Sequence, residues 1–156
     1  MPRVYIETTI PSFYFDRRRA PLMVARRQWT RAWWEVAIER YELRTGPPLH
    51  AELERGPVAR QQEWLSLVNP LPVLEVTDDV VAAAAVYRRE MLMPRHGEDA
   101  VHLALASVHD CSFLVTWDTR HLANALKLKH IRKINQRLGL PVPTLATPLQ
   151  MLGRMP

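Results

Sequence analysis

The amino-acid sequence predicts an α/β protein, a three-layer α/β/α sandwich with a mainly parallel central sheet, in a single domain spanning residues 1–156. Short runs of β-branched and aromatic residues alternate with longer segments whose apolar residues recur at helical spacing. Such β-α alternation is typical of parallel sheets that helices cover on both faces. A chain of 156 residues is also long enough to bury a sizeable core.

The segment 96–124 shows this alternation most sharply. After Asp99 the apolar residues recur every three or four positions, which predicts a helix with one buried face. Asp110 and Cys111 interrupt that pattern before Phe113–Val115, a short apolar run typical of a parallel strand buried on both faces. Ligands of open parallel sheets gather beyond the carboxyl ends of the strands. We therefore expect the carboxylate of Asp118, which follows the run, at that edge.

The N-terminal half predicts two strands and three helices. Arg3–Ile6 is a strand candidate that ends at Glu7, and Pro11 and Ser12 are expected to break the strand. Pro21 is suited to begin a long helix because its φ angle is already helical. Trp29 and Trp33 lie one turn apart on this helix, and we interpret them as core residues rather than as base-stacking surfaces. The further elements expected here are the strand Tyr41–Thr45 and the helices Leu49–Arg55 and Val58–Val68.

The C-terminal half continues the alternation. A strand is expected at Val73–Val76, and Asp78 or Asp79 can cap the next helix, which Pro94 and Gly97 end. Leu126–Arg137 reads as an amphipathic helix with a cationic face, stopped by Gly139. The last expected elements are an edge strand at Val142–Ala146 and a helical turn at Pro148–Leu152.

Composition favours a soluble cytoplasmic protein with a polyanionic partner. The chain has 21 Lys and Arg against 16 Asp and Glu, a net charge of +5. Cys111 is the single cysteine, so no intramolecular disulfide forms, and we interpret it as a small buried apolar residue. The first strand begins too near Met1 to leave room for a signal peptide, and Val80–Tyr87, the longest apolar stretch, is too short to cross a bilayer.

Four acids are candidates for a metal-dependent active site: Glu7, Glu52, Asp99 and Asp118. If the strands are parallel, these scattered carboxylates converge at one sheet edge, where they repel one another. A divalent cation removes that repulsion, and two such ions can activate water and stabilise the leaving oxygen of a phosphodiester. Three of the acids also have a structural alternative: Asp99 suits a helix N-terminus, Asp118 can cap the next turn, and Glu52 or its neighbour Glu54 can be a surface charge. Glu7 is harder to explain structurally, because an acid that ends an apolar strand is a poor structural choice.

Three separated blocks of sequence carry a resemblance to a known family. The run Asp99-Ala100-Val101-His102-Leu103-Ala104 is followed by Leu114-Val115-Thr116-Trp117-Asp118 and His121-Leu122-Ala123-Asn124, and Val4-Tyr5-Ile6-Glu7-Thr8-Thr9 opens the chain. In this order the blocks resemble the signature of PIN-domain ribonucleases, and above all the VapC-like toxins of bacterial toxin–antitoxin pairs. The likeness extends from end to end to a subgroup that begins with glutamate and carries a Trp33-Trp34-Glu35 run.

The resemblance implies a PIN-like fold and a metal-dependent endoribonuclease that uses Mg²⁺ or Mn²⁺. It implies an RNA substrate, an antitoxin protein as partner and a homodimer, and it places the four acids on the family's acidic positions. By the same likeness, Thr8 and Thr116 are hydroxyls that orient carboxylates or water, and Asn124 forms hydrogen bonds near the site. This chain departs from the family pattern at Glu7, where aspartate is usual, and at Gly46, where serine is common.

Several features keep other interpretations open. The cations Lys127, Lys129, Arg132 and Lys133 are either a solvated helix face or a surface that contacts RNA phosphates. The six histidines do not form a metal-binding set; His102 is either a satisfied buried residue or a neighbour of the site. The competing function is a non-catalytic protein that binds RNA or a partner and has a degenerate acidic site.

Overall fold

The centre of the molecule is a parallel sheet of four strands in the order β2-β1-β3-β4. The computed structural model describes residues 1–91, 98–120, 122 and 124–154. The strands are β1 (Arg3–Ile6), β2 (Glu42–Arg44), β3 (Phe113–Val115) and β4 (Thr144–Ala146). Every pairing among them is parallel, so their carboxyl ends share one edge. The predicted α/β class is therefore confirmed.

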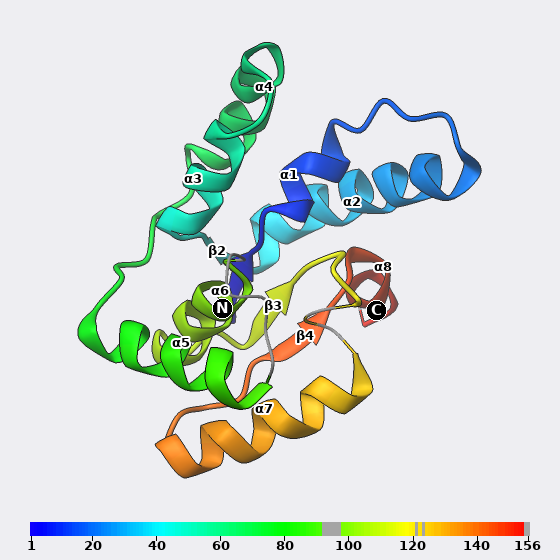
Figure 1. The fold of residues 1–156 in the computed structure, drawn as a ribbon. Helices are drawn as coiled ribbons and strands as arrows, with labels where there is room; N and C mark the ends of the chain where they lie inside the picture. Colours follow the sequence, from blue (N-terminus) through cyan, green and yellow to red (C-terminus); the bar gives the residue numbers. More distant parts are fainter. Residues whose placement is uncertain (92–97, 121, 123, 155–156) are drawn as a thin grey trace.

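One face of the sheet packs against three helices. Tyr5, Leu114 and Leu145 stand side by side in neighbouring strands, and all three are buried on this face. They share a core with apolar residues of the covering helices, which are α5 (Asp78–Met91), α6 (Asp99–Val108) and α7 (Ala125–Leu138). Figure 1 shows α5 and α7 below the sheet.

The other face packs against the remaining helices. Because side chains alternate along a strand, the next row of Ile6, Val115 and Ala146 points to this opposite face. The covering helices are α1 (Thr9–Tyr14), α2 (Pro21–Arg40), α3 (Pro47–Glu54), α4 (Val58–Val68) and α8 (Pro148–Gly153). The two cores make three layers, as predicted, with α1 and α2 above the sheet in Figure 1.

Several local predictions match the structure closely. Trp33 is fully buried, and Trp29 stacks on Trp117 with ring centroids 6.2 Å apart, so both tryptophans belong to the core. Cys111 is buried, and burial raises the pKa of its thiol to about 12. Gly139 ends α7 with a left-handed φ of 70°, a conformation that glycine adopts without strain. No helix in the described part of the chain is both long and apolar enough to span a membrane.

Two local predictions are wrong, and one helix, α1, was not predicted. The strand β1 ends before Pro11, as expected, and Pro11 lies in the first turn of α1, where its missing N–H is not needed. Val73–Val76 is not a strand: only Val73 forms a bridge, to Thr45, because the neighbouring chain turns away into α3 directly afterwards. The cap of α5 is Thr77, whose hydroxyl accepts the Val80 amide, while Asp78 and Asp79 lie within the first turn. The expected end of α5 at Pro94 and Gly97 lies outside the described residues.

Candidate active site

Strand register places Glu7 at the carboxyl edge of the sheet. Ile6 pairs with Val115, so the next residues, Glu7 and Thr116, lie side by side. The Glu7 amide donates to the Val115 carbonyl at 3.3 Å. The Thr116 hydroxyl donates to Glu7 Oε2 at 2.9 Å, and the Thr9 amide donates to Oε1. Both carboxylate oxygens of Glu7 are therefore held by the protein itself.

Burial makes Glu7 an unusual carboxylate. Its exposed fraction is only 3%, and burial raises its pKa from 4.5 to about 7. The charge of His102 and the hydrogen bonds from Thr9 and Thr116 lower this pKa but do not offset the cost of burial. A cation beside Glu7 would favour the charged carboxylate and relieve that cost.

Thr116 joins Glu7 to Asp118. Its hydroxyl accepts the Asp118 amide at 2.9 Å while it donates to Glu7, and it lies 3.4 Å from the Thr9 hydroxyl. Asp118 is half-buried, and its Oδ1 accepts the Arg120 amide at 3.1 Å. Thr116 and Asp118 both lie beyond the strand, because β3 ends at Val115 and a turn stabilised by the Thr116 hydroxyl follows.

Glu52 reaches the same region through His102. The Tyr5 hydroxyl lies 2.7 Å from His102 Nδ1, and His102 Nε2 lies 2.7 Å from Glu52 Oε1. Three elements distant in sequence, β1, α6 and α3, thus meet in what we call the Tyr5–His102–Glu52 chain. His102 is 1% exposed, so it is both a buried histidine and a direct neighbour of a candidate acid. Glu54, the alternative to Glu52, is exposed.

The electrostatics of His102 tie three of the candidate acids together. Burial alone lowers the pKa of this imidazole. The hydrogen bond to Glu52 and the negative charges of Glu7, Glu52 and Asp99 outweigh that effect and raise the pKa above its usual value. Asp99 lies in the first turn of α6, three residues before His102. The negative charges of Glu7, Glu52 and Asp99 therefore all raise the pKa of this one imidazole.

The glycine at position 46 has a physical explanation. A Cβ atom there would lie 2.4 Å from Leu105 Cδ1 and 2.9 Å from the Tyr5 hydroxyl oxygen. At such distances the Leu105 and Tyr5 side chains would have to shift to admit a Cβ at this position. The Tyr5 hydroxyl thus occupies the space beside position 46, where the family pattern commonly places serine.

The other predicted site residues lie around this centre or away from it. The Thr8 hydroxyl lies 3.3 Å from His102 Nε2. Asn124 caps α7, because its Oδ1 accepts the Lys127 amide at 2.9 Å, and its Nδ2 donates to the Arg120 carbonyl at 2.7 Å. The candidate RNA-binding cations project from α7 and are half-buried at one position and exposed at the others: Lys127, Lys129, Arg132 and Lys133. His96, His121 and Ala123 lie outside the described residues.

Two residues of the site were not found by sequence reasoning. Tyr5 precedes Glu7 by two positions, so strand alternation could have placed both on one side of β1. Thr9 was missed because the helix α1, which it begins, was not predicted. Its amide holds Glu7, and its hydroxyl accepts the Trp117 amide at 2.8 Å.

The donor chemistry fits a hard divalent cation, although the described side chains do not form a closed cage. Among the described residues, no group of three or more His, Cys, Asp or Glu side chains is arranged to hold a metal ion. Mg²⁺ does not require such a group, since it is commonly bound through one or two carboxylates with water and phosphate oxygens. The buried Glu7, with its raised pKa, is the carboxylate that a cation would stabilise most.

Comparison with solved structures identifies other proteins with this fold. One chain belongs to VapBC2 from Rickettsia felis, bound to a DNA fragment from their promoter, with a TM-score of 0.60 and 11% identity; the match covers 93% of this chain and 98% of that one. Another belongs to FitAcB from Neisseria gonorrhoeae, with a TM-score of 0.55 and 13% identity over 94% of this chain and 98% of that one. At such identity the likeness shows the fold alone. No protein-family model and no curated protein matches the sequence.

Proposed function

We propose that this protein is a divalent-metal-dependent endoribonuclease and the toxin of a toxin–antitoxin pair. The observation that carries the proposal is the buried Glu7 carboxylate at the sheet edge, connected through Thr116 to Asp118 and sharing the field at His102 with other acids. The VapC-like sequence blocks and the fold shared with VapBC2 and FitAcB support the toxin assignment.

In this proposal Glu7, Glu52, Asp99 and Asp118 hold Mg²⁺ or Mn²⁺. The chemistry supplied by the bound ion would be the activation of water and the stabilisation of the departing oxygen of an RNA phosphodiester. The chain's own residues fix the carboxylates. Thr9 and Thr116 hold both oxygens of Glu7, and the Tyr5–His102–Glu52 chain fixes the direction of Glu52. Because folding sets these directions in advance, the acids need little rearrangement to bind.

The partners follow from the same proposal. An antitoxin would silence the site by covering the acidic edge, and an arginine from it could pair with the carboxylates. The protein would act in the cytoplasm, where its RNA substrate is found, and as a homodimer. Light scattering of the purified protein measures the dimer directly, and a monomer at micromolar concentration would contradict that part.

Divalent-ion dependence separates this proposal from its rival. The enzyme should cut single-stranded RNA in Mn²⁺ or Mg²⁺ and stop when a chelator is added. The non-catalytic protein with a degenerate site would instead retard RNA on a gel and leave it intact under both conditions. If the protein retards RNA on the gel and the RNA stays intact in Mn²⁺, the protein is the non-catalytic RNA-binding protein and not the nuclease.

A further inference from the structure

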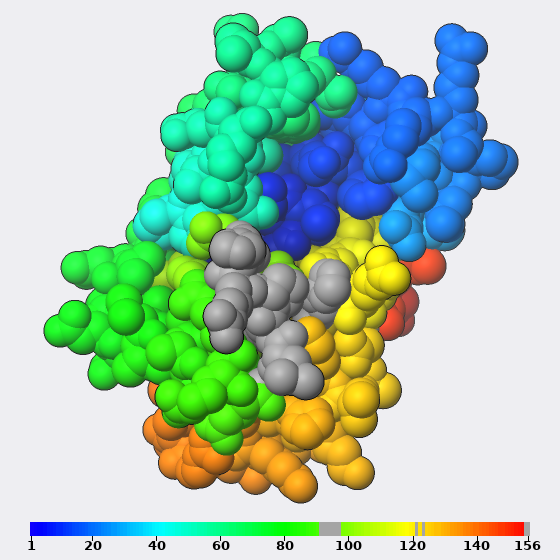
Figure 2. Space-filling model, in the orientation of Figure 1, coloured from blue at the N-terminus to red at the C-terminus, as the bar shows by residue number. Residues whose placement is uncertain are grey.

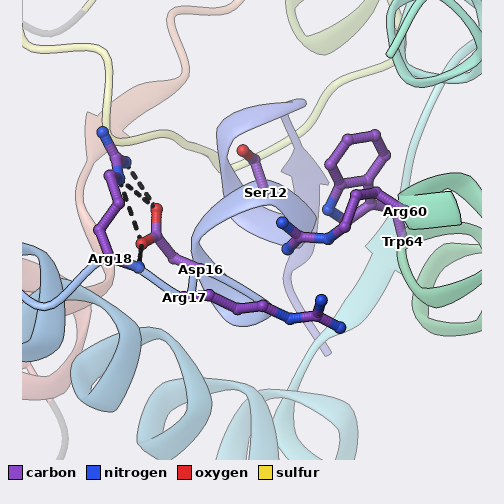
Figure 3. Close-up of a pocket in the computed structure, with 6 residues that line it drawn as sticks. All are labelled: Ser12, Asp16, Arg17, Arg18, Arg60 and Trp64. Atoms are coloured by element: carbon purple, nitrogen blue, oxygen red, sulfur yellow. Dashed lines mark hydrogen bonds and ion pairs between the residues drawn. The ribbon is translucent and has the colours of Figure 1, made fainter. Parts of the chain in front are cut away.

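A cleft of about 470 Å³ opens between the loop after α1 and helix α4. Figure 2 shows the recess between the α3–α4 hairpin and the α1–α2 segment, with N-terminal residues at its floor. Figure 3 shows that Arg17 and Arg60 extend into the same space from the loop and from α4. We call this space the Arg17–Arg60 cleft; its lining residues are Ser12, Asp16, Arg17, Arg18, Arg60 and Trp64.

The cleft carries an excess of positive charge. Asp16 is neutralised by Arg18, whose Nη2 donates to Oδ2 at 2.6 Å and whose Nε donates to the same oxygen at 2.9 Å. These hydrogen bonds hold the pKa of Asp16 below its usual value. Arg17 and Arg60 remain, and they share the single carboxylate of Glu63. Two guanidinium groups beside one carboxylate leave one positive charge available to an anion.

Arg60 is held in place before any ligand arrives. Its Nη2 donates to the Phe15 carbonyl at 2.5 Å, and its guanidinium lies 5.4 Å from the centre of the Trp64 ring. Trp64 is itself fixed, because its ring fills the space beside Gly56, where a Cβ would lie only 2.6 Å away. The Arg60 side chain is 24% exposed, so it keeps contact with solvent.

Arg17 is the adaptable member of the pair. Its side chain is 67% exposed, and its ion pair with Glu63 is a surface contact of a kind that contributes little to stability. A phosphate can therefore replace the carboxylate at small cost. The planar guanidinium group binds two phosphate oxygens at once, which makes arginine well suited to this ligand.

The position of the cleft matches a nucleic-acid strand that crosses the acidic edge. Ser12 lies three residues after Thr9 on α1, and the Thr9 amide holds Glu7. Three residues of an α-helix rise about 4.5 Å, so the Ser12 side of the cleft lies about one turn of α1 from the residue that holds Glu7. We propose that the Arg17–Arg60 cleft binds a backbone phosphate of the RNA strand on one side of the bond to be cut. This inference rests on the proposed ribonuclease function and replaces α7 as the main contact for RNA phosphates.

Charge-reversal variants test the cleft without any catalysis. We would measure the anisotropy of a fluorescein-labelled 10-nucleotide oligouridylate in chelator at several salt concentrations. Arg17→Glu should raise Kd roughly tenfold and lower the salt slope by about 1. The matched control is Arg19→Glu, which reverses the same charge two residues away and should change Kd no more than about twofold. Arg60→Gln, checked by melting, should weaken binding as Arg17→Glu does.

Several outcomes would overturn the inference. Equal effects of Arg17→Glu and Arg19→Glu on Kd would show that only overall charge matters. Wild-type protein that does not bind oligouridylate would show that RNA is not the ligand of the cleft. A labelled polyglutamate peptide tests the competing occupant: Arg17-dependent binding of the peptide but not of RNA would assign the cleft to an acidic protein segment. RNA cleavage by the wild-type protein in Mn²⁺ is measured on the same preparation. Cleavage of RNA whose binding does not depend on Arg17 refutes only the phosphate-binding role of the cleft. Binding of RNA without cleavage refutes the proposed nuclease function.

Discussion

Replacing Glu7 by glutamine should stabilise the metal-free protein above neutral pH. The carboxylate is buried, and its folded pKa of about 7 exceeds the ordinary 4.5. A raised folded pKa means that the contribution of this group to stability is present below pH 4.5 and is lost as the pH rises through about 7. With roughly 1.4 kcal/mol for each unit of pKa, the loss between pH 5 and pH 8 is about 2–3 kcal/mol. Glutamine has nearly the same shape but does not titrate, so it avoids this loss.

One term opposes the gain. Glu7 Oε1 accepts the Thr9 amide and Oε2 accepts the Thr116 hydroxyl, whereas glutamine has a single side-chain oxygen, so one of these two donors loses its acceptor. The mismatch costs about 1 kcal/mol at every pH. The difference in free energy of unfolding between the variant and wild type should therefore grow by about 2–3 kcal/mol from pH 5 to pH 8, whatever its starting value.

Thermal and urea unfolding in chelator, followed by circular dichroism at both pH values, measures that difference. The control is Glu54→Gln, which removes an exposed glutamate and should show no pH-dependent gain. For a protein of this size, 1 kcal/mol corresponds to a change in Tm of about 2–4 °C. A Glu7→Gln difference that is equal at pH 5 and pH 8 would refute the argument that Glu7 is destabilised by burial.

The remaining predictions concern the metal, the length of residue 7, position 46 and the partner. Millimolar Mn²⁺ should raise the Tm of the wild-type protein more at pH 8 than at pH 6, because the ion competes with the proton on Glu7. Calorimetry that finds no change in Tm at either pH would argue against the metal site. Glu7→Asp should keep part of the RNA cleavage per folded molecule and Glu7→Gln almost none, since the first shortens the carboxylate and the second removes its charge; full activity of the glutamine variant would remove Glu7 from the site. Gly46→Ala should destabilise the fold by about 1–3 kcal/mol in urea unfolding, because the new methyl group meets Leu105 and Tyr5, and a neutral result would contradict the packing described. Expression without an antitoxin should arrest growth of the host, measured as colony counts, and normal growth together with RNA that stays intact would count against the toxin assignment.

Elements set by local pattern were predictable from sequence, and those set by distant partners were not. Arg3–Ile6, Phe113–Val115 and Val58–Val68 have the predicted bounds because local apolar spacing defines them, and a proline also precedes the first and the last of these segments. Val73–Val76 has an equally strand-like composition, but Thr45 is the only described residue that pairs with it. A strand needs a partner of matching length, and local composition does not reveal one.

The site divides in the same way. The spacing of Glu7 and Asp118 after apolar runs was enough to place both at the sheet edge, because parallel strands end together. The Tyr5–His102–Glu52 chain was not predictable, since it depends on how α6 and α3 pack against β1. The exclusion of a side chain at Gly46 has the same origin, because the Tyr5 hydroxyl fills the space only in the folded protein.

The most direct test of the proposed nuclease compares two neighbouring glutamates of α3. Glu52 contacts His102 at the acidic edge, whereas Glu54, two residues later, is exposed. We would measure cleavage of single-stranded RNA in Mn²⁺ per folded molecule for wild type, Glu52→Gln and Glu54→Gln. Wild-type activity that disappears in chelator, falls at least a hundredfold in Glu52→Gln (about 3 kcal/mol of barrier) and persists in Glu54→Gln is the expected result. Equal activity of the two variants, or cleavage that continues in chelator, would contradict a metal-dependent acidic site at this edge.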